Sequence, residues 1–134
     1  MSIVVTFGTY DLFHVGHLRV LERAAELGDR LVVGVSTDEL NIAKKGYAPV
    51  YSYEERSRIV GALRVVDEVF PEESLEAKGD YLRDFGADTL VMGSDWEGRF
   101  DEFGSICKVV YLPRTPGIST SKLRRVLASD ADEF

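Results

Sequence analysis

Short β-branched and aromatic runs alternate with amphipathic helix patterns along the whole chain, and this alternation limits the possible folds more than any other feature. Each apolar run ends at Gly, Pro or a polar cluster, which is typical of buried strands. Repeated strand–helix–strand units predict a single Rossmann-like, doubly wound α/β domain with a mainly parallel five-stranded sheet. The predicted strands are residues 3–7, 31–35, 65–70, 89–92 and 109–112, and the predicted helices are 16–27, 52–63, 75–85 and 119–127.

The segments between these elements predict where a ligand would bind. Gly46 and Pro49 break the helical pattern from Asn41 to Val50, so a loop is predicted there. Residues 1–128 are expected to form the domain, and residues 129–134 a short acidic tail. Ligands of doubly wound sheets bind beyond the carboxyl ends of the strands. The connections to inspect are therefore residues 8–16, 36–50, 93–104 and 113–119.

Composition excludes several classes of function. An apolar fraction of 45% is too high for a disordered chain, and 134 residues suffice for one core. No run approaches the ~18 apolar residues that a membrane span needs, and no signal-peptide pattern opens the chain. The one cysteine, Cys107, lies in an apolar run, so it is expected in the core of a reduced, cytoplasmic protein. The net charge of -7 argues against nucleic acid and anionic membranes as partners.

The charge is unevenly distributed along the chain. Residues 41–64 hold five basic and two acidic residues, and residues 114–125 hold four basic residues and no acid. Residues 65–102, in contrast, hold three basic and twelve acidic residues. The two basic segments are either solvated helix faces, as most charge runs are, or two halves of a site for a small polyanion.

Both histidines of the chain follow the first predicted strand, at positions 14 and 17. A zinc site is a weak alternative because it needs three or four ligands, and a buried structural histidine is another alternative. The position at a strand-to-helix junction favours an anion site, since Gly16 allows close approach to the backbone and the helix N-terminus offers free N–H groups. The glycines match neither the dinucleotide-binding nor the Walker pattern.

A second candidate anion site follows the last predicted strand. Arg114 begins a segment with a Pro-Gly turn, three hydroxyl residues from Ser119 to Ser121, and Lys122. A plain helix cap after a turn is the alternative interpretation. Two such segments at the same edge of one sheet favour a triphosphate that spans both.

These two segments resemble the paired signatures of the cytidylyltransferases, within the nucleotidyltransferase superfamily. Residues 8–17, GTYDLFHVGH, are similar to the family pattern GTFDxxHxGH, and residues 114–121, RTPGISTS, are similar to RTxGISTT. The resemblance extends from Val4 to Leu127. It implies transfer of a cytidylyl group from CTP to glycerol 3-phosphate, giving CDP-glycerol and pyrophosphate, by in-line attack of the acceptor phosphate on the α-phosphate. It also implies that Mg²⁺ accompanies CTP, without a metal site on the protein.

The resemblance assigns roles to individual residues. Gly46 stands where a second family lysine is expected, so the residue that takes that role is left open. Asp95 is hypothesised to read the amino group of cytosine, with Trp96 stacking on the base. The implied catalytic residues are His14, His17, Lys44 and Arg114; the implied CTP contacts are Gly8, Thr9, Tyr10, His14, Gly16, His17, Asp95, Arg114, Thr115, Gly117, Ile118, Ser119 and Thr120; and the implied acceptor contacts are Lys44, Lys45, Arg56 and Lys78.

Two other functions remain open from the sequence. The same chemistry could act on another small phosphate monoester, such as phosphoethanolamine, phosphocholine or another polyol phosphate. A nucleotide-binding sensor without catalysis is the alternative from a different class, although every signature residue expected to act is present. The resemblance also implies a homodimer with residues 64–69 at the contact, where an exposed edge strand is equally compatible with the pattern.

Overall fold

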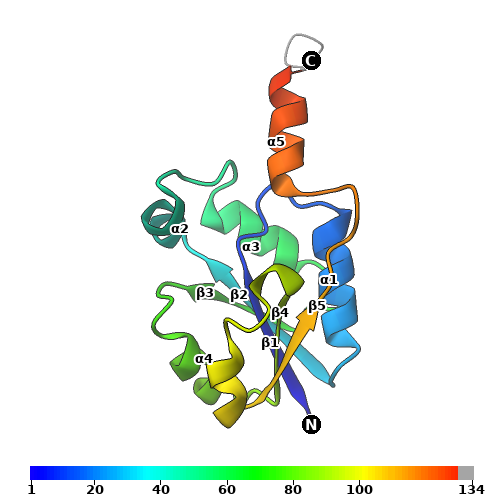
Figure 1. The fold of residues 1–134 in the computed structure, drawn as a ribbon, viewed down its shortest axis with the longest axis vertical. Helices are drawn as coiled ribbons and strands as arrows, with labels where there is room; N and C mark the ends of the chain where they lie inside the picture. Colours follow the sequence, from blue (N-terminus) through cyan, green and yellow to red (C-terminus); the bar gives the residue numbers. More distant parts are fainter. Residues whose placement is uncertain (130–134) are drawn as a thin grey trace.

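The computed structural model describes residues 1–129, which form a parallel sheet flanked by helices (Figure 1). The strand order is β3-β2-β1-β4-β5, and every pairing is parallel, so the predicted sheet is confirmed. The strands are β1 (Ile3–Gly8), β2 (Arg30–Ser36), β3 (Glu68–Glu72), β4 (Thr89–Gly93) and β5 (Lys108–Leu112); the helices are α1 (Val15–Ala25), α2 (Asp38–Lys45), α3 (Tyr53–Gly61), α4 (Lys78–Asp84) and α5 (Thr120–Ser129), with short 3₁₀ helices η1 (Ser94–Trp96) and η2 (Asp101–Ser105).

The core consists of two apolar layers, one on each face of the sheet. Successive residues of a strand point to opposite faces, so Val4 of β1 packs with α1 and α3 while Val5 packs with α4. Burying a side chain of this size contributes roughly 1.5–3 kcal/mol. Cys107 is buried in the layer under α4, as predicted, and this burial raises the pKa of its thiol.

The order of the strands in the sheet determines where a ligand-binding crevice can form. The chain runs from β1 outward to β2 and β3, and then returns to the other side of β1 for β4 and β5. The direction of winding therefore reverses between β1 and β4, and a crevice forms beyond the carboxyl ends of these two strands. The segments after Gly8 and after Gly93 border that crevice.

The predicted loop from residue 41 to residue 50 is wrong over its first half, because α2 extends to Lys45. The Thr37 hydroxyl caps this helix by accepting the N–H of Leu40, and Asp38 and Glu39 stand in its first turn. Gly46 ends it with a φ of 82°, in the left-handed conformation that favours glycine. The capping box predicted for the next helix is present at Ser52 and starts α3.

The third strand begins and ends later than predicted. Residues 65–70 were expected to form a strand closed by Pro71, whereas β3 contains Pro71 in register with Val35 of β2. Proline has no N–H to donate to a neighbouring strand. Because β3 is an edge strand with a strand on one side only, it tolerates proline.

The carboxyl end of the described chain is helical. Helix α5 extends away from the body of the domain in Figure 1 and includes Ser129, which was predicted to begin the acidic tail. Residues 130–134 of that tail lie outside the described residues. No helix between residues 1 and 129 has the length and apolar character required to cross a bilayer.

Candidate active site

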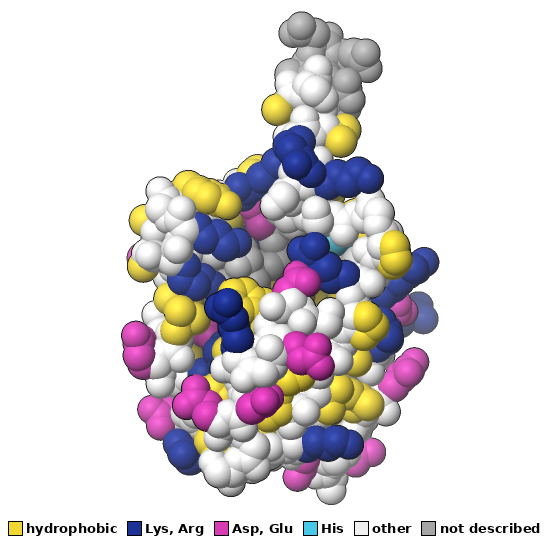
Figure 2. Space-filling model, in the orientation of Figure 1, with side chains coloured by type: hydrophobic (Ala, Val, Ile, Leu, Met, Phe, Trp, Pro, Cys, Tyr) yellow, Lys and Arg dark blue, Asp and Glu magenta, His cyan; other side chains and the backbone are white. Residues whose placement is uncertain are grey.

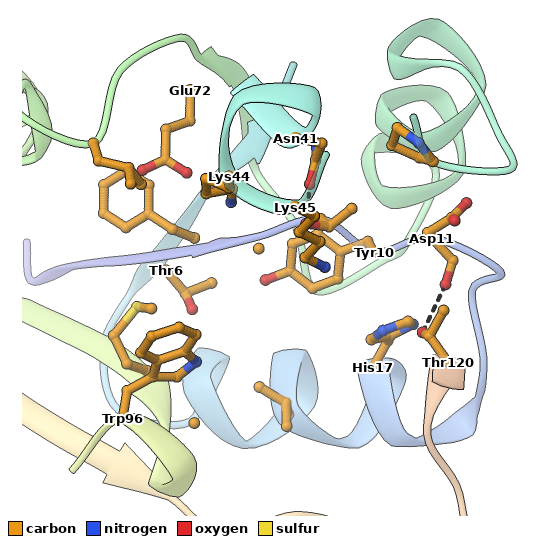
Figure 3. A pocket seen from close by; sticks show the side chains of 18 of the residues that line it. Thr6, Tyr10, Asp11, His17, Asn41, Lys44, Lys45, Glu72, Trp96 and Thr120 are labelled. Atoms are coloured by element: carbon orange, nitrogen blue, oxygen red, sulfur yellow. Dashed lines mark hydrogen bonds between the residues drawn. The ribbon is translucent and has the colours of Figure 1, made fainter. Parts of the chain in front are cut away.

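A cavity of about 770 Å³ opens at the carboxyl ends of the strands, at the predicted position. Figure 3 shows its polar wall, to which β1, α1, α2 and the start of α5 each contribute side chains. Of the residues implied by the resemblance, those that line the cavity are Gly8, Thr9, Tyr10, His17, Lys44, Lys45, Lys78, Arg114 and Thr120. Those that do not line it are His14, Gly16, Arg56, Asp95, Thr115, Gly117, Ile118 and Ser119.

The two histidines form the first turn of α1. His14 is the N-cap residue, and its Nδ1 accepts the N–H of Gly16 at 3.0 Å. The Nδ1 of His17 accepts the N–H of His14 at 3.2 Å, and the two rings stack with centroids 3.8 Å apart. Because each Nδ1 accepts a hydrogen bond, each neutral ring carries its proton on Nε2. Both imidazoles can therefore donate a hydrogen bond through Nε2.

Burial keeps the pair neutral. The pKa of His17 is lowered from 6.5 to about 3, first by burial and then by the neighbouring His14, while Asp11 opposes the shift. Burial also lowers the pKa of His14. Gly16 was expected to admit a ligand to the backbone, but the imidazole of His14 takes that space: a Cβ at position 16 would be 2.8 Å from its Cε1.

The loop between β1 and α1 has a strained backbone. Tyr10 and Leu12 both have positive φ, at 56° and 48°, a region that side chains other than glycine rarely adopt. The Tyr10 ring lines the cavity and contacts His17 edge-on, with centroids 5.5 Å apart. Burial raises the pKa of the Tyr10 hydroxyl.

Lys44 and Lys45 enter the cavity from the last turn of α2. This helix is fixed by Asn41, whose side-chain amide donates to the Thr37 carbonyl at 2.9 Å and whose Oδ1 accepts from the Thr9 hydroxyl at 2.9 Å. Burial lowers the pKa of Lys44, opposed by the charge of Glu72. Within residues 1–129, neither lysine has a carboxylate partner at ion-pair distance, so both charges remain available to an anion.

In the second signature segment, residues 114–121, only residues at the two ends line the cavity, and residues 115–119 do not. Arg114 lines the mouth, where its Nε lies 2.7 Å from Asp95 Oδ2, and Thr120 donates to the Asp11 carbonyl at 2.9 Å. Ser119 caps α5 by accepting the N–H of Lys122 at 3.1 Å. Asp95, expected to contact the base, is half exposed and paired with Arg114, while the neighbouring Trp96 lines the cavity.

Sequence reasoning missed Asp11, which holds three segments together. Its carboxylate accepts the N–H groups of Val50 and Tyr51 at 2.8 and 2.9 Å and pairs with Arg124 at 2.7 Å. Burial acts against the charged form, but these hydrogen bonds and the Arg124 charge together lower the pKa of Asp11. Its position between the first strand and His14 was the available signal. Other polar lining residues that were missed include Thr6, Asn41, Glu72, Arg99 and Arg124.

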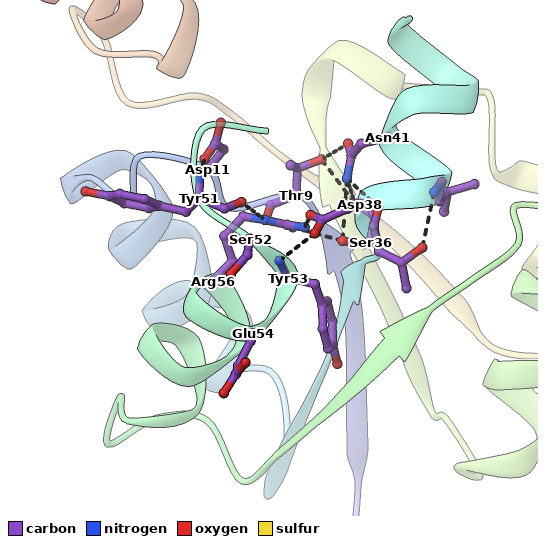
Figure 4. Close-up of polar contacts among 12 residues, drawn as sticks. Thr9, Asp11, Ser36, Asp38, Asn41, Tyr51, Ser52, Tyr53, Glu54 and Arg56 are labelled. Carbon is purple, nitrogen blue, oxygen red and sulfur yellow. Dashed lines mark hydrogen bonds and ion pairs between the residues drawn. The ribbon is translucent and has the colours of Figure 1, made fainter. Parts of the chain in front are cut away.

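Arg56 is placed differently from its predicted acceptor contact. Its side chain is completely buried, and Figure 4 shows it pointing into the backbone between β1, β2 and α2. The guanidinium donates to the carbonyls of Tyr51, Thr9 and Ser36 and pairs with Asp38 at 2.8 Å. These groups occupy four of its five N–H donors, so Arg56 supports the cavity wall and does not face the acceptor.

Lys78, the last of the predicted acceptor contacts, lines the cavity, but its charge is already paired. Its Nζ lies 2.6 Å from Oε2 of Glu72, and both side chains are almost completely buried. Burial lowers the pKa of the lysine, opposed by Glu72.

Basic side chains surround the hollow of the molecule in Figure 2, whereas acidic side chains gather on the part farther from α5. The basic segments 41–64 and 114–125 both contribute to this rim, through Lys44, Lys45, Arg114 and Arg124. Among the described residues, the cavity thus offers the unpaired cations of Lys44 and Lys45 together with the neutral imidazole of His17, which suits a ligand with several phosphate groups.

Comparisons with known proteins agree with this chemistry. The model of the family described as cytidylyltransferase-like matches residues 5–126. The chain is 52% identical to the glycerol-3-phosphate cytidylyltransferase of Bacillus subtilis (strain 168), over 96% of this chain and 98% of the relative. It is 48% identical to the protein of that name from Staphylococcus aureus (strain NCTC 8325 / PS 47), over 95% and 96%. A lipopolysaccharide core biosynthesis protein from Thermoplasma volcanium GSS1, 23% identical, shares the fold with a TM-score of 0.72 over 86% of this chain and 98% of that one.

Proposed function

The chain belongs to the cytidylyltransferase-like family, and from this membership we propose that it transfers a cytidylyl group from CTP to glycerol 3-phosphate, giving CDP-glycerol and pyrophosphate. The observation that carries the proposal is the identity of 48–52% to glycerol-3-phosphate cytidylyltransferases over nearly the full length of both chains. The cavity supports it, because His17, Lys44 and Arg114 converge there from three separate elements.

The reaction needs positioning more than covalent chemistry. An acceptor phosphate oxygen forms a bond to the α-phosphorus of CTP, and the bond from that phosphorus to the oxygen bridging the β-phosphate breaks. A phosphate monoester is largely dianionic at neutral pH, since its second pKa is about 6, so the attacking oxygen needs no general base. The protein lowers the barrier by aligning the two phosphates and stabilising the charge that develops on the α-phosphate and on the departing pyrophosphate.

Each cation and donor of the cavity has a place in this scheme. His17 donates through Nε2 to the phosphates of CTP, and His14, stacked on it, holds it in that orientation and donates beside it. Lys44 bridges the acceptor phosphate and the α-phosphate, with Lys45 next to it. Arg114 leaves Asp95 and binds the β- and γ-phosphates; its release frees the Asp95 carboxylate to accept from the cytosine amino group.

Mg²⁺ is proposed to enter with CTP and not to occupy a site on the protein. Residues 1–129 contain no cluster of three or more His, Cys, Asp or Glu side chains able to hold a metal ion. Mg²⁺ commonly binds substrate phosphates and keeps several of its waters, which fits this donor set. The chemistry it supplies is neutralisation of the triphosphate.

Release of pyrophosphate tests the function directly. Purified protein is incubated with CTP, Mg²⁺ and, in separate reactions, glycerol 3-phosphate, phosphoethanolamine and phosphocholine. The proposal expects release with glycerol 3-phosphate, slower release with the other acceptors, and little release when UTP replaces CTP. Tight CTP binding without pyrophosphate release from any acceptor would instead assign the chain to nucleotide-binding sensors.

We also propose a homodimer that forms through the segment 64–69. This segment leads into β3, whose outer edge has no strand partner within the described chain. Sedimentation velocity checks the proposal: the dimer has twice the mass of the chain, and a single-chain mass at micromolar concentration rules it out. The reaction is placed in the cytoplasm, where nucleoside triphosphates are available and the thiol of Cys107 stays reduced.

A further inference from the structure

One wall of the cavity holds a buried ion pair that phosphate binding does not explain. Glu72 is the last residue of β3 and Lys78 the first residue of α4, and both line the cavity. Their side chains are 3% and 4% exposed, with Nζ and Oε2 2.6 Å apart. A carboxylate at this depth repels a phosphate and neutralises the charge of Lys78, which would otherwise attract one. Lys44 and Lys45, which lack such a partner among residues 1–129, suit the acceptor phosphate better.

Aromatic rings complete the surroundings of the lysine. The Nζ of Lys78 lies 3.8 Å from the centroid of the Phe7 ring and 5.5 Å from that of Phe100. A carboxylate beside aromatic faces is an arrangement that proteins use to bind organic cations. Here the chain's own ammonium group occupies the cation position.

We propose that the Glu72–Lys78 pair selects the acceptor by its head group: it binds the hydroxyls of a polyol phosphate, and Lys78 excludes ammonium heads by filling their place. The inference rests on the proposed cytidylyl transfer. A hydroxyl both donates and accepts, so it can donate to the Glu72 carboxylate and accept from the Lys78 ammonium at once. An ammonium head would bring a second positive charge against Lys78 in a poorly solvated wall, and specificity is commonly achieved by such a repulsive contact.

The neighbouring lysine gives the pair its place relative to the reaction. Lys44, Glu72 and Lys78 line the same cavity, and the charge of Glu72 raises the pKa of Lys44 while that of Lys78 lowers it. Figure 3 shows Glu72 and Lys44 in the same part of the cavity, at a distance from His17. An acceptor whose phosphate lies on Lys44 therefore has its carbon end directed toward the pair, while CTP occupies the His17 side.

Three variants test the proposal. Lys78→Ala removes the ammonium and leaves an empty space beside Glu72; Lys78→Met removes the charge but fills the space; the double variant Glu72→Gln with Lys78→Met removes both charges and keeps the volume. For each, kcat/KM is measured with glycerol 3-phosphate and with phosphoethanolamine. The thermal midpoint is measured with and without free ethanolamine, a readout that does not depend on catalysis.

We expect Lys78→Ala to lose at least about tenfold in kcat/KM for glycerol 3-phosphate and to gain at least about tenfold for phosphoethanolamine. Ethanolamine should raise its thermal midpoint by several degrees, or restore cooperative melting if the unpaired Glu72 prevents folding. Lys78→Met and the double variant should gain neither property. Equal losses of kcat/KM for both acceptors in Lys78→Ala would overturn the proposal and indicate that Lys78 binds the acceptor phosphate. A Lys78→Ala protein that ethanolamine does not stabilise would overturn it in the same way. Failure of the wild-type protein to release pyrophosphate would instead refute the underlying function, and the ethanolamine experiment would still be decisive for the pair.

Discussion

The two ring nitrogens of His17 have different roles in the proposed mechanism. Its Nδ1 completes the capping box of α1, which leaves its Nε2–H to donate to the phosphates in the proposed reaction. Replacing His17 with Ala should therefore lower kcat by about 100-fold or more, because a preorganised donor to developing charge is lost. Steady-state pyrophosphate release at saturating CTP measures the effect.

His17→Gln is the matched control, since a glutamine at this position of the capping box can still accept the N–H of His14. It should keep the thermal midpoint closer to that of the wild type than His17→Ala does, while turnover stays low in both. Turnover near the wild-type rate in either variant would remove His17 from the reaction.

The same residue makes stability depend on pH. The pKa of His17 is about 3 in the folded protein and 6.5 in the unfolded chain, so between these values the unfolded chain binds a proton that the folded protein does not. Stability should fall as the pH falls through this window, with a slope from this group of at most about 1.4 kcal/mol per pH unit. Urea denaturation of the wild type and of His17→Gln from pH 7 to pH 5 measures the difference. Parallel curves for the two proteins would contradict this assignment.

At the scale of elements, α2 depends on the glycine that caps its carboxyl end. Gly46 has a φ of 82° and no atom near the position of a Cβ, so Gly46→Ala isolates the cost of the left-handed backbone. We expect a loss of about 1–2 kcal/mol in the free energy of unfolding, measured by urea denaturation. Gly104→Ala is the control, because Gly104 also has open space but no positive φ, and it should change stability little. Equal effects of the two substitutions would show that the cap conformation carries no cost.

Helix α5 is held to the domain through Asp11, by the Thr120 hydroxyl and the Arg124 guanidinium. Arg124→Met should loosen the helix and accelerate amide hydrogen exchange in residues 120–129 by about fivefold or more, because the buried Asp11 carboxylate loses its partly exposed cationic partner. Arg125→Met changes an exposed neighbour and should leave exchange unchanged. Equal protection in the two variants would mean that Arg124 does not anchor α5.

The elements that sequence patterns predicted are those whose buried faces are apolar. Helix α2 escaped prediction because its buried face includes Asn41, whose burial is satisfied by Thr9, Ser36 and Thr37 and not by apolar packing. Hydrophobic periodicity does not predict such a helix, although the sequence contains both of its capping residues, Thr37 and Gly46. The two anion segments were predictable, since their glycines, hydroxyls and histidines stand together in sequence.

At the scale of the molecule, Arg56 joins parts that are far apart along the chain. It donates to the carbonyls just after β1, at the end of β2 and just before α3, and to the carboxylate of Asp38. Arg56→Met should lower the free energy of unfolding by about 3 kcal/mol or more, because buried carbonyls lose their donors and an ion pair is broken. Arg58→Met, an exposed position on the same helix, is the control for the urea denaturation experiment. A loss below about 1 kcal/mol at Arg56 would contradict its bracing role.

The roles of Arg56, Glu72 and Asp11 could not be inferred from local sequence for one physical reason. A charged side chain has the same local pattern whether it faces a ligand or a cluster of backbone carbonyls, and only the packing of distant strands and helices decides between these. Arg56 thus resembled a phosphate ligand, and Glu72 resembled one of many surface acids in the segment 65–102.

The contact between Asp11 and Thr120 joins residues 109 positions apart and closes the cavity with an element near the carboxyl end of the chain. During synthesis on the ribosome, the histidine turn, α2 and most of the sheet emerge before α5 does. A nascent chain can therefore form much of its core while the cavity still lacks Thr120 and Arg124. If the cavity binds CTP as proposed, a chain whose synthesis has not reached α5 would neither retain CTP nor consume it.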